Sequence, residues 1–392
     1  MPEASSVIPL WDRTAEWRRR LEMIQQARVF LYLSTFYIEW DAYARELLDA
    51  LDAAVRRGVA VSLLVDGFGQ QLGGVLMTAT DRQALMARLD GLRSAGATVT
   101  FYRPGRTVQR WLGGGQHVKI QAADTGEAIF GSSNITKTSF EGWNEFSVAV
   151  RGPIVRALLE SWPALGGTVA PAHLNLLDRV TTADGASAGQ PPPGTACALD
   201  YWCCNPNLHQ GPLGPLGWRG SNEVTDRMVE MLDAARSSVQ ITAFYFKPVP
   251  ALMAAVVRAA RRGVAVEVFH SHREALPATD LAWIAAAVNY PALLDAGVTI
   301  HENRRGEHSK IVIVDDDWAA FGSYNFEDAA HDRLAEAMLA TRDVGVVEAI
   351  RGIVLSLRGD ADTVQVSPDW ARRLPVRLRG KMAVMGRFKR WM

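Results

Sequence analysis

The chain has 392 residues, with 42 basic and 42 acidic side chains, so its formal net charge is zero. That balance argues against a protein that tracks a nucleic-acid backbone, because such a protein normally needs an extended cationic surface. Hydrophobic residues make up 48% of the chain, which is ordinary for a globular protein, and the length predicts two domains.

Apolar strands alternate with amphipathic helices through the first half of the chain. The sequence predicts helices at 13–27, 41–57 and 80–95, and strands at 27–38, within 56–69 and at 97–105. A run of three glycines then leads into His117. Alternation of this kind is typical of βαβ units and predicts an α/β fold with a mainly parallel sheet.

The second half repeats this order, with predicted helices at 223–236 and 249–262 around a strand at 237–246. Its segment RRGVAVEVFHSH matches RRGVAVSLLVDG of the first half at its start, and DAGVTIHENRRG matches SAGATVTFYRPG. A repeat that covers whole helices and strands indicates a duplicated domain.

Composition then predicts the boundaries. We expect an N-terminal domain at 1–177, a linker rich in proline and glycine at 178–222, a C-terminal domain at 223–360 and a basic amphipathic tail at 361–392. The chain has three cysteines, Cys197, Cys203 and Cys204. Two of them are adjacent, which fits no usual CxxC pair, so reduced thiols are favoured over a zinc site with His209.

The most informative stretch occurs twice, at 117–145 and at 308–336. The copies align without a gap and share seven residues, His117/His308, Lys119/Lys310, Asp124/Asp315, Gly131/Gly322, Ser132/Ser323, Asn134/Asn325 and Glu145/Glu336. A histidine and a lysine two positions apart project from the same face of a strand. Each half therefore offers one imidazole, one ammonium and neutral donors, which is half of a phosphate site.

Two such halves can perform phosphoryl transfer without a metal or cofactor. One imidazole attacks phosphorus, and the other protonates the leaving alcohol and then deprotonates the incoming one. Lysines and amide or hydroxyl donors stabilise the charge on the phosphate oxygens. A carboxylate that holds the far nitrogen of each imidazole orients it, and Glu145 and Glu336 are the candidates, each 28 residues after a histidine.

Both copies fit the HxKxxxxD…GSxN signature, and the chain resembles the phospholipase D superfamily. The resemblance implies two pseudo-twofold-related α/β domains with mixed, largely parallel sheets and one active site at their interface. It implies His117 as the nucleophile and His308 as the acid/base, although the repeat itself does not distinguish them. It further implies phosphate-binding roles for Lys119, Lys310, Asn134 and Asn325, supporting substrate contacts from Ser132 and Ser323, and structural roles near the site for Asp124 and Asp315.

Within that superfamily, LLVDGFG and VRGPIV are most similar to the short bacterial cardiolipin synthases. The resemblance implies transfer of a phosphatidyl group from phosphatidylglycerol to an alcohol-bearing acceptor through a phosphohistidine. Three alternatives stay open: a phospholipase D that uses water as acceptor, a metal-independent nuclease, and a lipid-binding module without catalysis. Asp66 of the first segment fits either a loop cap or a site residue.

The expected partners are an anionic phospholipid and a membrane surface, with no nucleic acid. No apolar run approaches the ~20 residues that span a bilayer, and the N-terminus lacks a secretory signal pattern. The tail carries cations among Phe388, Trp391 and aliphatic residues, which favours an anionic membrane surface. We therefore expect a cytoplasmic protein that is peripheral on the inner face of the cell membrane.

Overall fold

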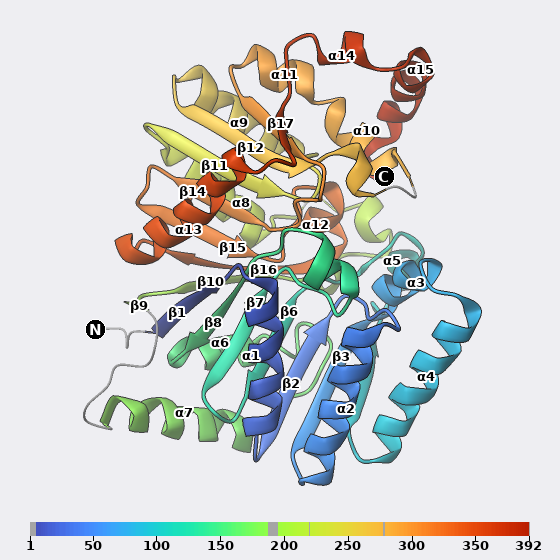
Figure 1. Cartoon of the computed structure of the whole chain (residues 1–392), viewed down its shortest axis with the longest axis vertical. Coiled ribbons are helices and arrows are strands. Elements are labelled where there is room, and N and C mark those ends of the chain that lie inside the picture. The colour runs from blue at the N-terminus through green and yellow to red at the C-terminus, as the bar shows by residue number, and fades with distance from the viewer. Residues whose placement is uncertain (1–4, 187–194, 219, 277–278, 392) are drawn as a thin grey trace.

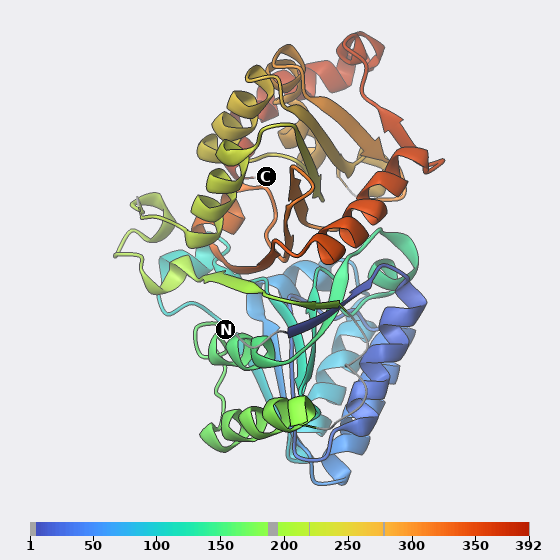
Figure 2. The same ribbon diagram turned by 90° about the vertical axis from the view of Figure 1, so that its left-hand side faces the viewer.

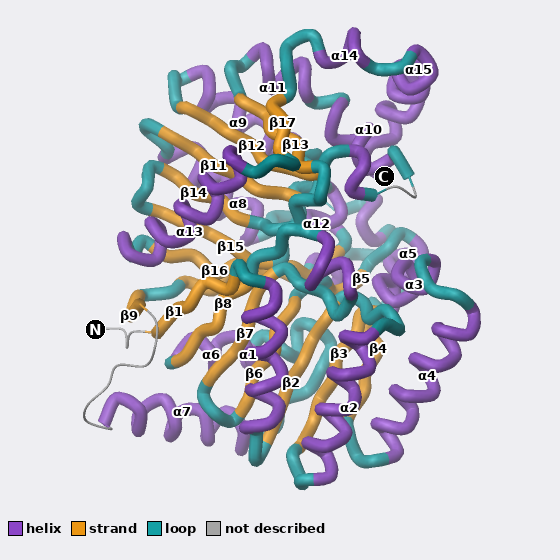
Figure 3. Tube along the Cα trace, viewed as in Figure 1, coloured by secondary structure: helices purple, strands orange, loops and turns teal. Residues whose placement is uncertain are grey.

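The structure is a computed structural model that describes residues 5–186, 195–218, 220–276 and 279–391. Two α/β halves lie one above the other in Figure 1, the N-terminal half below in blue and green and the C-terminal half above in yellow to red. Strands and helices alternate in both halves (Figure 3). None of the helices in the described part of the chain is long and apolar enough to cross a bilayer.

The N-terminal half is one sheet with helices on its faces. Its elements are β1 (Ser5–Leu10), α1 (Arg13–Gln26), β2 (Phe30–Thr35), α2 (Ala42–Arg56), β3 (Ala60–Asp66), α3 (Gly67–Val75), α4 (Ala79–Ser94), β4 (Thr98–Tyr102), α5 (Thr107–Trp111), β5 (Gly115–Gln116), β6 (Lys119–Ala123), β7 (Glu127–Gly131), the π-helix η1 (Thr138–Gly142), β8 (Ser147–Arg151), α6 (Pro153–Glu160) and α7 (Pro171–Ala186). Side chains at Asp12, Asp41 and Thr78 accept a backbone N–H at the starts of α1, α2 and α4, which is a favourable N-cap.

The C-terminal half repeats the arrangement. Its elements are β10 (Asp200–Cys204), α8 (Glu223–Ala234), β11 (Ser238–Ala243), α9 (Pro250–Arg261), β12 (Ala265–Ser271), α10 (Leu281–Ala287), α11 (Tyr290–Asp295), β13 (Thr299–Asn303), β14 (Ile311–Val314), β15 (Trp318–Gly322), α12 (Asp328–Asp332), β16 (Leu334–Thr341), α13 (Val344–Ser356), β17 (Thr363–Gln365), α14 (Trp370–Arg373) and α15 (Val376–Met385), followed by the 3-10 turns η6 (Gly386–Trp391).

The strand order confirms the duplicated fold. One sheet runs β4-β3-β2-β6-β7-β8-β1-β9, where β9 is Thr195–Cys197, and the other contains β10-β16-β15-β14-β11-β12-β13-β17. The series β4-β3-β2-β6-β7-β8 therefore corresponds to β13-β12-β11-β14-β15-β16. The sheets are mixed, as predicted, but antiparallel neighbours outnumber parallel ones. Crossover helices make β2-β3-β4 and β11-β12-β13 parallel, whereas the tight turns of the repeated motif add antiparallel hairpins.

The segment expected to be a linker contributes strands to both sheets. Strand β9 (Thr195–Cys197) pairs with β1, and β10 pairs with β16. Since β10 precedes α8 as β1 precedes α1, the second repeat begins at β10 and not at residue 223. The segment 187–194, which includes the expected proline run, lies outside the described residues.

The expected tail also belongs partly to the C-terminal half. Strand β17 pairs with β13, and buried Leu378 of α15 joins the C-terminal core, with Met382 and Met385 packed against it. Trp370 lies 4.9 Å from Tyr290, measured between ring centroids. The residues after 360 thus complete a domain instead of extending from it.

The two halves share a continuous apolar core. Phe130 and Phe146 of the N-terminal half pack in one cluster with Phe321 and Leu339 of the C-terminal half. The rings of Phe146 and Phe321 meet edge to face at 5.5 Å between centroids. Figure 2 shows the C-terminal half stacked on the N-terminal half. Because the burial is apolar and extends across both sheets, it fixes the two halves of the repeated motif relative to each other.

Candidate active site

Each histidine of the repeated motif is bound through its backbone to the opposite half. His117 N donates to Ala335 O at 2.8 Å, and His308 N donates to Asn144 O at 2.8 Å. The short parallel pairings of β5 with β16, and of Asn144 with Glu307, contain these bonds. Ala335 and Asn144 immediately precede Glu336 and Glu145, so each histidine is placed beside the glutamate of the other half.

The imidazole side chains follow the same crosswise pattern. His308 Nδ1 lies 2.8 Å from Glu145 Oε2 in a hydrogen bond. His117 Nδ1 lies 3.0 Å from Glu336 Oε1, but its hydrogen bond is to Ser323 O at 3.1 Å. The glutamates predicted as orienting carboxylates thus contact the histidines of the opposite half. With Nδ1 engaged in both rings, Nε2 is the nitrogen left for a substrate.

The two glutamates differ in their surroundings. Ser139 Oγ donates to Glu145 Oε1 at 2.7 Å, whereas the residue that corresponds to Ser139 in the second copy is Ala330, which has no hydroxyl. Burial opposes ionisation of Glu145, but His308, Lys310 and the hydrogen bonds lower its pKa to about 2. Burial raises the pKa of Glu336 to about 8. The pseudo-twofold symmetry of the sequence is therefore broken at the carboxylates.

The two motif serines hold the glutamates. Ser132 Oγ donates to Glu145 Oε2 at 2.5 Å, and Ser323 Oγ donates to Glu336 Oε2 at 2.5 Å. Each hydroxyl also accepts the backbone N–H of the residue after its glutamate, Phe146 or Ala337, at 3.0 Å. Both serines are fully buried and their hydroxyls support the glutamates, while the supporting contact with substrate stays a prediction.

The glycine before each serine permits this close approach. A Cβ on Gly131 would lie 2.4 Å from Phe146 O, and one on Gly322 would lie 2.4 Å from Ala337 O. No side chain fits at those distances, so glycine lets the strand pass against the segment that carries the glutamate.

The two motif lysines are buried side by side with the histidines. Lys119 Nζ donates to His117 O at 2.7 Å, and Lys310 Nζ donates to His308 O at 2.6 Å. Burial lowers the pKa of Lys310 to about 8, although Glu145 and Glu336 oppose the change. Burial and the charge of Lys310 lower the pKa of Lys119 as well. Two like charges held in a low-dielectric site favour binding of an anion between them.

The histidines open onto one cavity of about 220 Å³ at the interface of the two halves. Its lining combines both repeats: Phe36, Tyr37, His117, Asn134, Trp143, Phe244, Tyr245, Lys247, Ala282, His308, Asn325 and Glu327. Both motif asparagines therefore face the same space as both imidazoles. A single cavity with residues of both halves is the arrangement expected for one composite site.

Aromatic residues that are not among the seven shared residues of the motif form the walls. Phe36 meets the ring of His117 edge-on at 4.7 Å, and Phe244 meets His308 edge-on at 4.8 Å. Trp143 lies 4.9 Å from His308 on another side. The sequence does indicate a role for these aromatic residues, because a Phe-Tyr dipeptide occurs in both halves, in STFYIE and TAFYFK. Each dipeptide directly follows a strand, β2 or β11.

The motif aspartates lie at the opposite ends of β6 and β14 from the histidines. Asp124 accepts the backbone N–H of Arg28, and Asp315 accepts those of Arg236 and Ser237. The two aspartates therefore hold connections between strands, and they do so at a distance from the site, not beside it as expected. Asp66 caps α3 by accepting Gly69 N at 2.6 Å and also accepts Gln116 N at 2.8 Å, which fixes the residue before His117.

No cluster of three or more histidine, cysteine, aspartate or glutamate side chains that could hold a metal ion exists within the described ranges. The three cysteines are free thiols in β9 and β10.

The fold and this site define a duplicated α/β protein with two HxK half-sites joined at one cavity. The family described as cardiolipin synthase, PLD-like domain, matches residues 21–162 and 228–357. The chain belongs to this phospholipase D-like family and is an enzyme of the phospholipase D type.

Similar proteins come from several bacteria. The chain is 28% identical over 343 residues to cardiolipin synthase B of Salmonella typhimurium, covering 82% of this chain and 73% of that protein. It is also 28% identical to cardiolipin synthase A of Pseudomonas fluorescens, covering 85% of this chain and 64% of the relative. The crystal structure of phosphatidylserine synthase from Haemophilus influenzae superposes with a TM-score of 0.72 at 15% identity, covering 100% of this chain and 96% of the other, which establishes the shared fold.

The lysine electrostatics predict a pH-dependent affinity for phosphate diesters. Dimethyl phosphate is a suitable probe because it stays a monoanion through the whole range. Its affinity should fall as the pH rises through about 8, since Lys310 then loses its proton and Glu336 gains charge. Titration calorimetry in buffers of different ionisation enthalpy should show proton uptake on binding. Lys310→Arg, which stays protonated, should flatten the profile, and a flat profile in the unaltered protein would contradict this electrostatic description.

Proposed function

We propose that this protein is a phosphatidyltransferase that moves the phosphatidyl group of phosphatidylglycerol to an alcohol-bearing acceptor through a phosphohistidine. The observation that supports this most strongly is the pair of imidazoles whose Nδ1 atoms are both engaged across the interface while both rings line one cavity. The cardiolipin synthases among its relatives supply the substrate class.

His117 is the nucleophile in this proposal. Burial lowers its pKa, so the ring is neutral, and the Nδ1 proton is directed to Ser323 O. Nε2 then carries the lone pair and attacks phosphorus. As the P–N bond forms, the bond from phosphorus to the leaving glycerol oxygen breaks, and that oxygen takes a proton from His308 Nε2.

His308 is the acid/base because Glu145 favours its charged form. Burial lowers the pKa of His308 to about 3, although Glu145 opposes the change. Glu145 is ionised and bonded to His308 Nδ1, so when a phosphate charge enters the cavity it stabilises the imidazolium, whose Nε2 proton is taken up from solvent as the substrate binds. In the second step the acceptor hydroxyl gives its proton to His308 Nε2 and attacks phosphorus. The P–N bond breaks, and His117 is released in its neutral form.

Lys119, Lys310 and Asn134 stabilise the phosphate oxygens. Thr35 Oγ1 donates to Asn134 Oδ1 at 3.4 Å, which turns the amide nitrogen toward the cavity as a donor. Charged and neutral donors that are already in place need little reorganisation when charge develops in the transition state.

A substrate with an activated leaving group tests these roles. With phosphatidyl-p-nitrophenol, the first step needs no acid, so His308→Ala should release one equivalent of nitrophenol and accumulate a phosphatidyl adduct. Peptide mass analysis should place the adduct on His117, and His117→Ala should form none. An adduct on His308 in the unaltered protein, or full turnover by His117→Ala, would contradict the assignment.

The natural reaction distinguishes the transferase from its alternatives. With phosphatidylglycerol vesicles, the proposal predicts cardiolipin and free glycerol by mass spectrometry. Phosphatidic acid as the sole product would indicate a phospholipase D that uses water, and cleavage of an oligonucleotide in a parallel reaction would indicate a nuclease.

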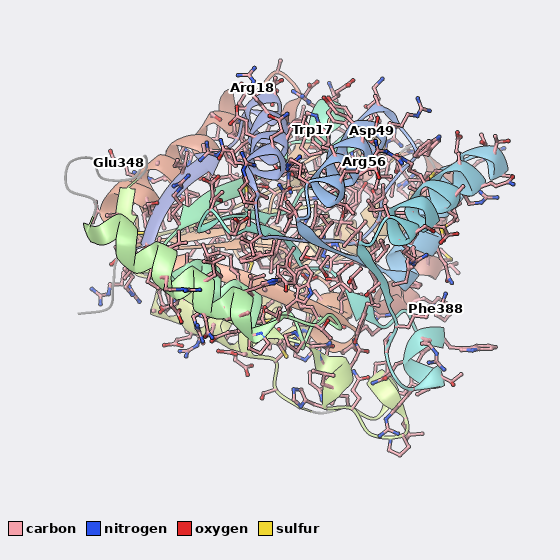
Figure 4. All side chains as sticks on the ribbon, turned by 90° about the horizontal axis from the view of Figure 1, so that it is seen from below. Trp17, Arg18, Asp49, Arg56, Glu348 and Phe388 are labelled. Carbon is pink, nitrogen blue, oxygen red and sulfur yellow. The ribbon has the colours of Figure 1, made fainter. Side chains whose placement is uncertain are left out.

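The substrate requires contact with a membrane, and we place that contact on α3, α5 and α15. Figure 1 shows these three helices on the same side of the molecule. Val75 is 80% exposed, Trp111 86% and Val376 74%. Val376 and Val384 lie on α15 and Phe388 lies on the following turns η6, with exposed arginines between them. Phe388 lies at the periphery of the molecule in Figure 4. Exposed apolar side chains among cations fit an anionic lipid surface.

Substitution tests this surface better than deletion of the tail, because deletion would remove Leu378 from the C-terminal core. Val384→Glu combined with Phe388→Glu should weaken binding to phosphatidylglycerol vesicles by about tenfold or more, as two apolar side chains lose their burial in lipid. Turnover of a short-chain soluble substrate should be unchanged. Val344→Glu, at an exposed position on α13, is the matched control. Unchanged vesicle affinity in the double variant would place the contact elsewhere.

A further inference from the structure

One ion pair on the cavity wall has no counterpart in the N-terminal half. Lys247 Nζ lies 2.9 Å from Glu327 Oε2, and both residues line the cavity of the two histidines. The backbone bonds Glu39 N to Ile135 O and Lys247 N to Phe326 O are equivalent in the two halves. Lys247 therefore corresponds to Glu39, and Glu327 corresponds to Thr136. The pair exists in the C-terminal half alone.

The pair leaves hydrogen-bonding groups available toward the cavity. The Lys247 side chain is 7% exposed, and Glu327 is its one ion-pair partner among the described residues. Asn325 Nδ2 donates to Glu327 Oε1 at 3.3 Å, and Asn325 Oδ1 is buried without a hydrogen-bond partner in the described structure. Next to an ammonium donor there are thus a carboxylate and an orphaned amide oxygen, both acceptors.

Stability alone does not account for this arrangement. Removing two charges from water is costly, and a well-packed apolar pair of similar volume is often as stable or more stable. The corresponding place in the N-terminal half is filled without such a pair, so the duplicated fold does not require it. An orphaned buried acceptor likewise calls for a ligand that donates to it.

The chemistry of these groups selects a neutral, hydroxyl-bearing ligand. A hydroxyl accepts from the ammonium and donates to the carboxylate or amide oxygen, which neither a cationic nor a purely anionic group can do. The charge of Lys247 would repel a cationic headgroup, and the charge of Glu327 would repel an anionic one. A polyol with two adjacent hydroxyls satisfies both acceptors and the donor at once.

We propose that Lys247, Glu327 and Asn325 Oδ1 form a subsite for a neutral polyol headgroup, such as glycerol. This inference rests on the proposed phosphatidyl transfer and specifies its acceptor. The acceptor alcohol approaches phosphorus along the path by which the leaving glycerol departs, because the second step reverses the first at the same histidine. One subsite then serves both the glycerol that leaves and the glycerol hydroxyl that enters.

Competition between acceptors tests the subsite. Phosphatidylglycerol vesicles are incubated with deuterated glycerol and ethanol together, and mass spectrometry gives labelled phosphatidylglycerol, phosphatidylethanol and phosphatidic acid. All three products come from one covalent intermediate, so changes in earlier steps cancel from their ratios. Lys247→Met and Glu327→Gln should each lower the glycerol-to-ethanol ratio about tenfold or more, the effect of losing a hydrogen bond to a charged group. Lys247→Arg should retain part of the preference.

Lys137→Met, which removes an exposed lysine paired with Glu141, is the matched control and should leave the ratio unchanged. An unchanged ratio in both Lys247→Met and Glu327→Gln would overturn the subsite while leaving phosphatidyl transfer in place. Loss of every product in all three cavity variants, with melting temperatures preserved, would also overturn it, because the pair would then act in the covalent step. If the unaltered protein makes no cardiolipin and labels no lipid with glycerol, the proposed function fails and the subsite fails with it.

Discussion

The active site depends on one constraint: each motif histidine is held by groups of the opposite half. The backbone N–H of His117 bonds to Ala335 O and that of His308 to Asn144 O, and the glutamates next to those carbonyls contact the imidazoles. Each half therefore supplies the backbone carbonyl and the carboxylate that contact the histidine of the other half. The shared core around Phe130, Phe146 and Phe321 is what keeps the halves in register. The packing of the two halves against each other therefore determines the geometry of the site.

Burial gives these contacts their chemical effect. His117, Lys119, His308 and Lys310 are almost fully buried, and burial is the largest influence on the pKa of each of them. Before substrate binds, the imidazoles are neutral, and burial makes the positive charge of the two ammonium groups costly. A phosphate diester that enters the cavity supplies the missing negative charge. The free energy gained by compensating buried charges is available for binding and for stabilising the transition state.

Sequence reasoning identified the fold and predicted residues that the structure brings together at one cavity, because both leave local patterns. The HxK pair shares one strand face, and the glutamates recur at a fixed offset, so the repeat alone selected them. The repeat did not indicate that each serine hydroxyl donates to a glutamate thirteen residues later, because that contact is set by the close approach at Gly131 and Gly322.

Contacts that depend on how the two halves pack together could not be predicted from the sequence. Nothing local indicates that Glu145 serves His308, or that β10 pairs with β16 and so begins the second repeat. Lys247 and Glu327 differ from the corresponding residues of the N-terminal half, so the repeat gives no indication of their ion pair. The Phe-Tyr dipeptides did match, but their role as walls beside the imidazoles follows only from the ends of β2 and β11 meeting at the cavity.

Nitrogen-15 spectra of the imidazoles test the crosswise arrangement most directly. The chain has eight histidines, so selective labelling gives a tractable set of signals, and His117→Asn and His308→Asn assign the two that matter. Glu145→Gln should change the Nδ1 and Nε2 shifts of His308 and leave those of His117 nearly unchanged, and Glu336→Gln should do the reverse. If each substitution instead perturbs the histidine of its own half, the two half-sites do not exchange their carboxylates, and the account given for the composite site is wrong.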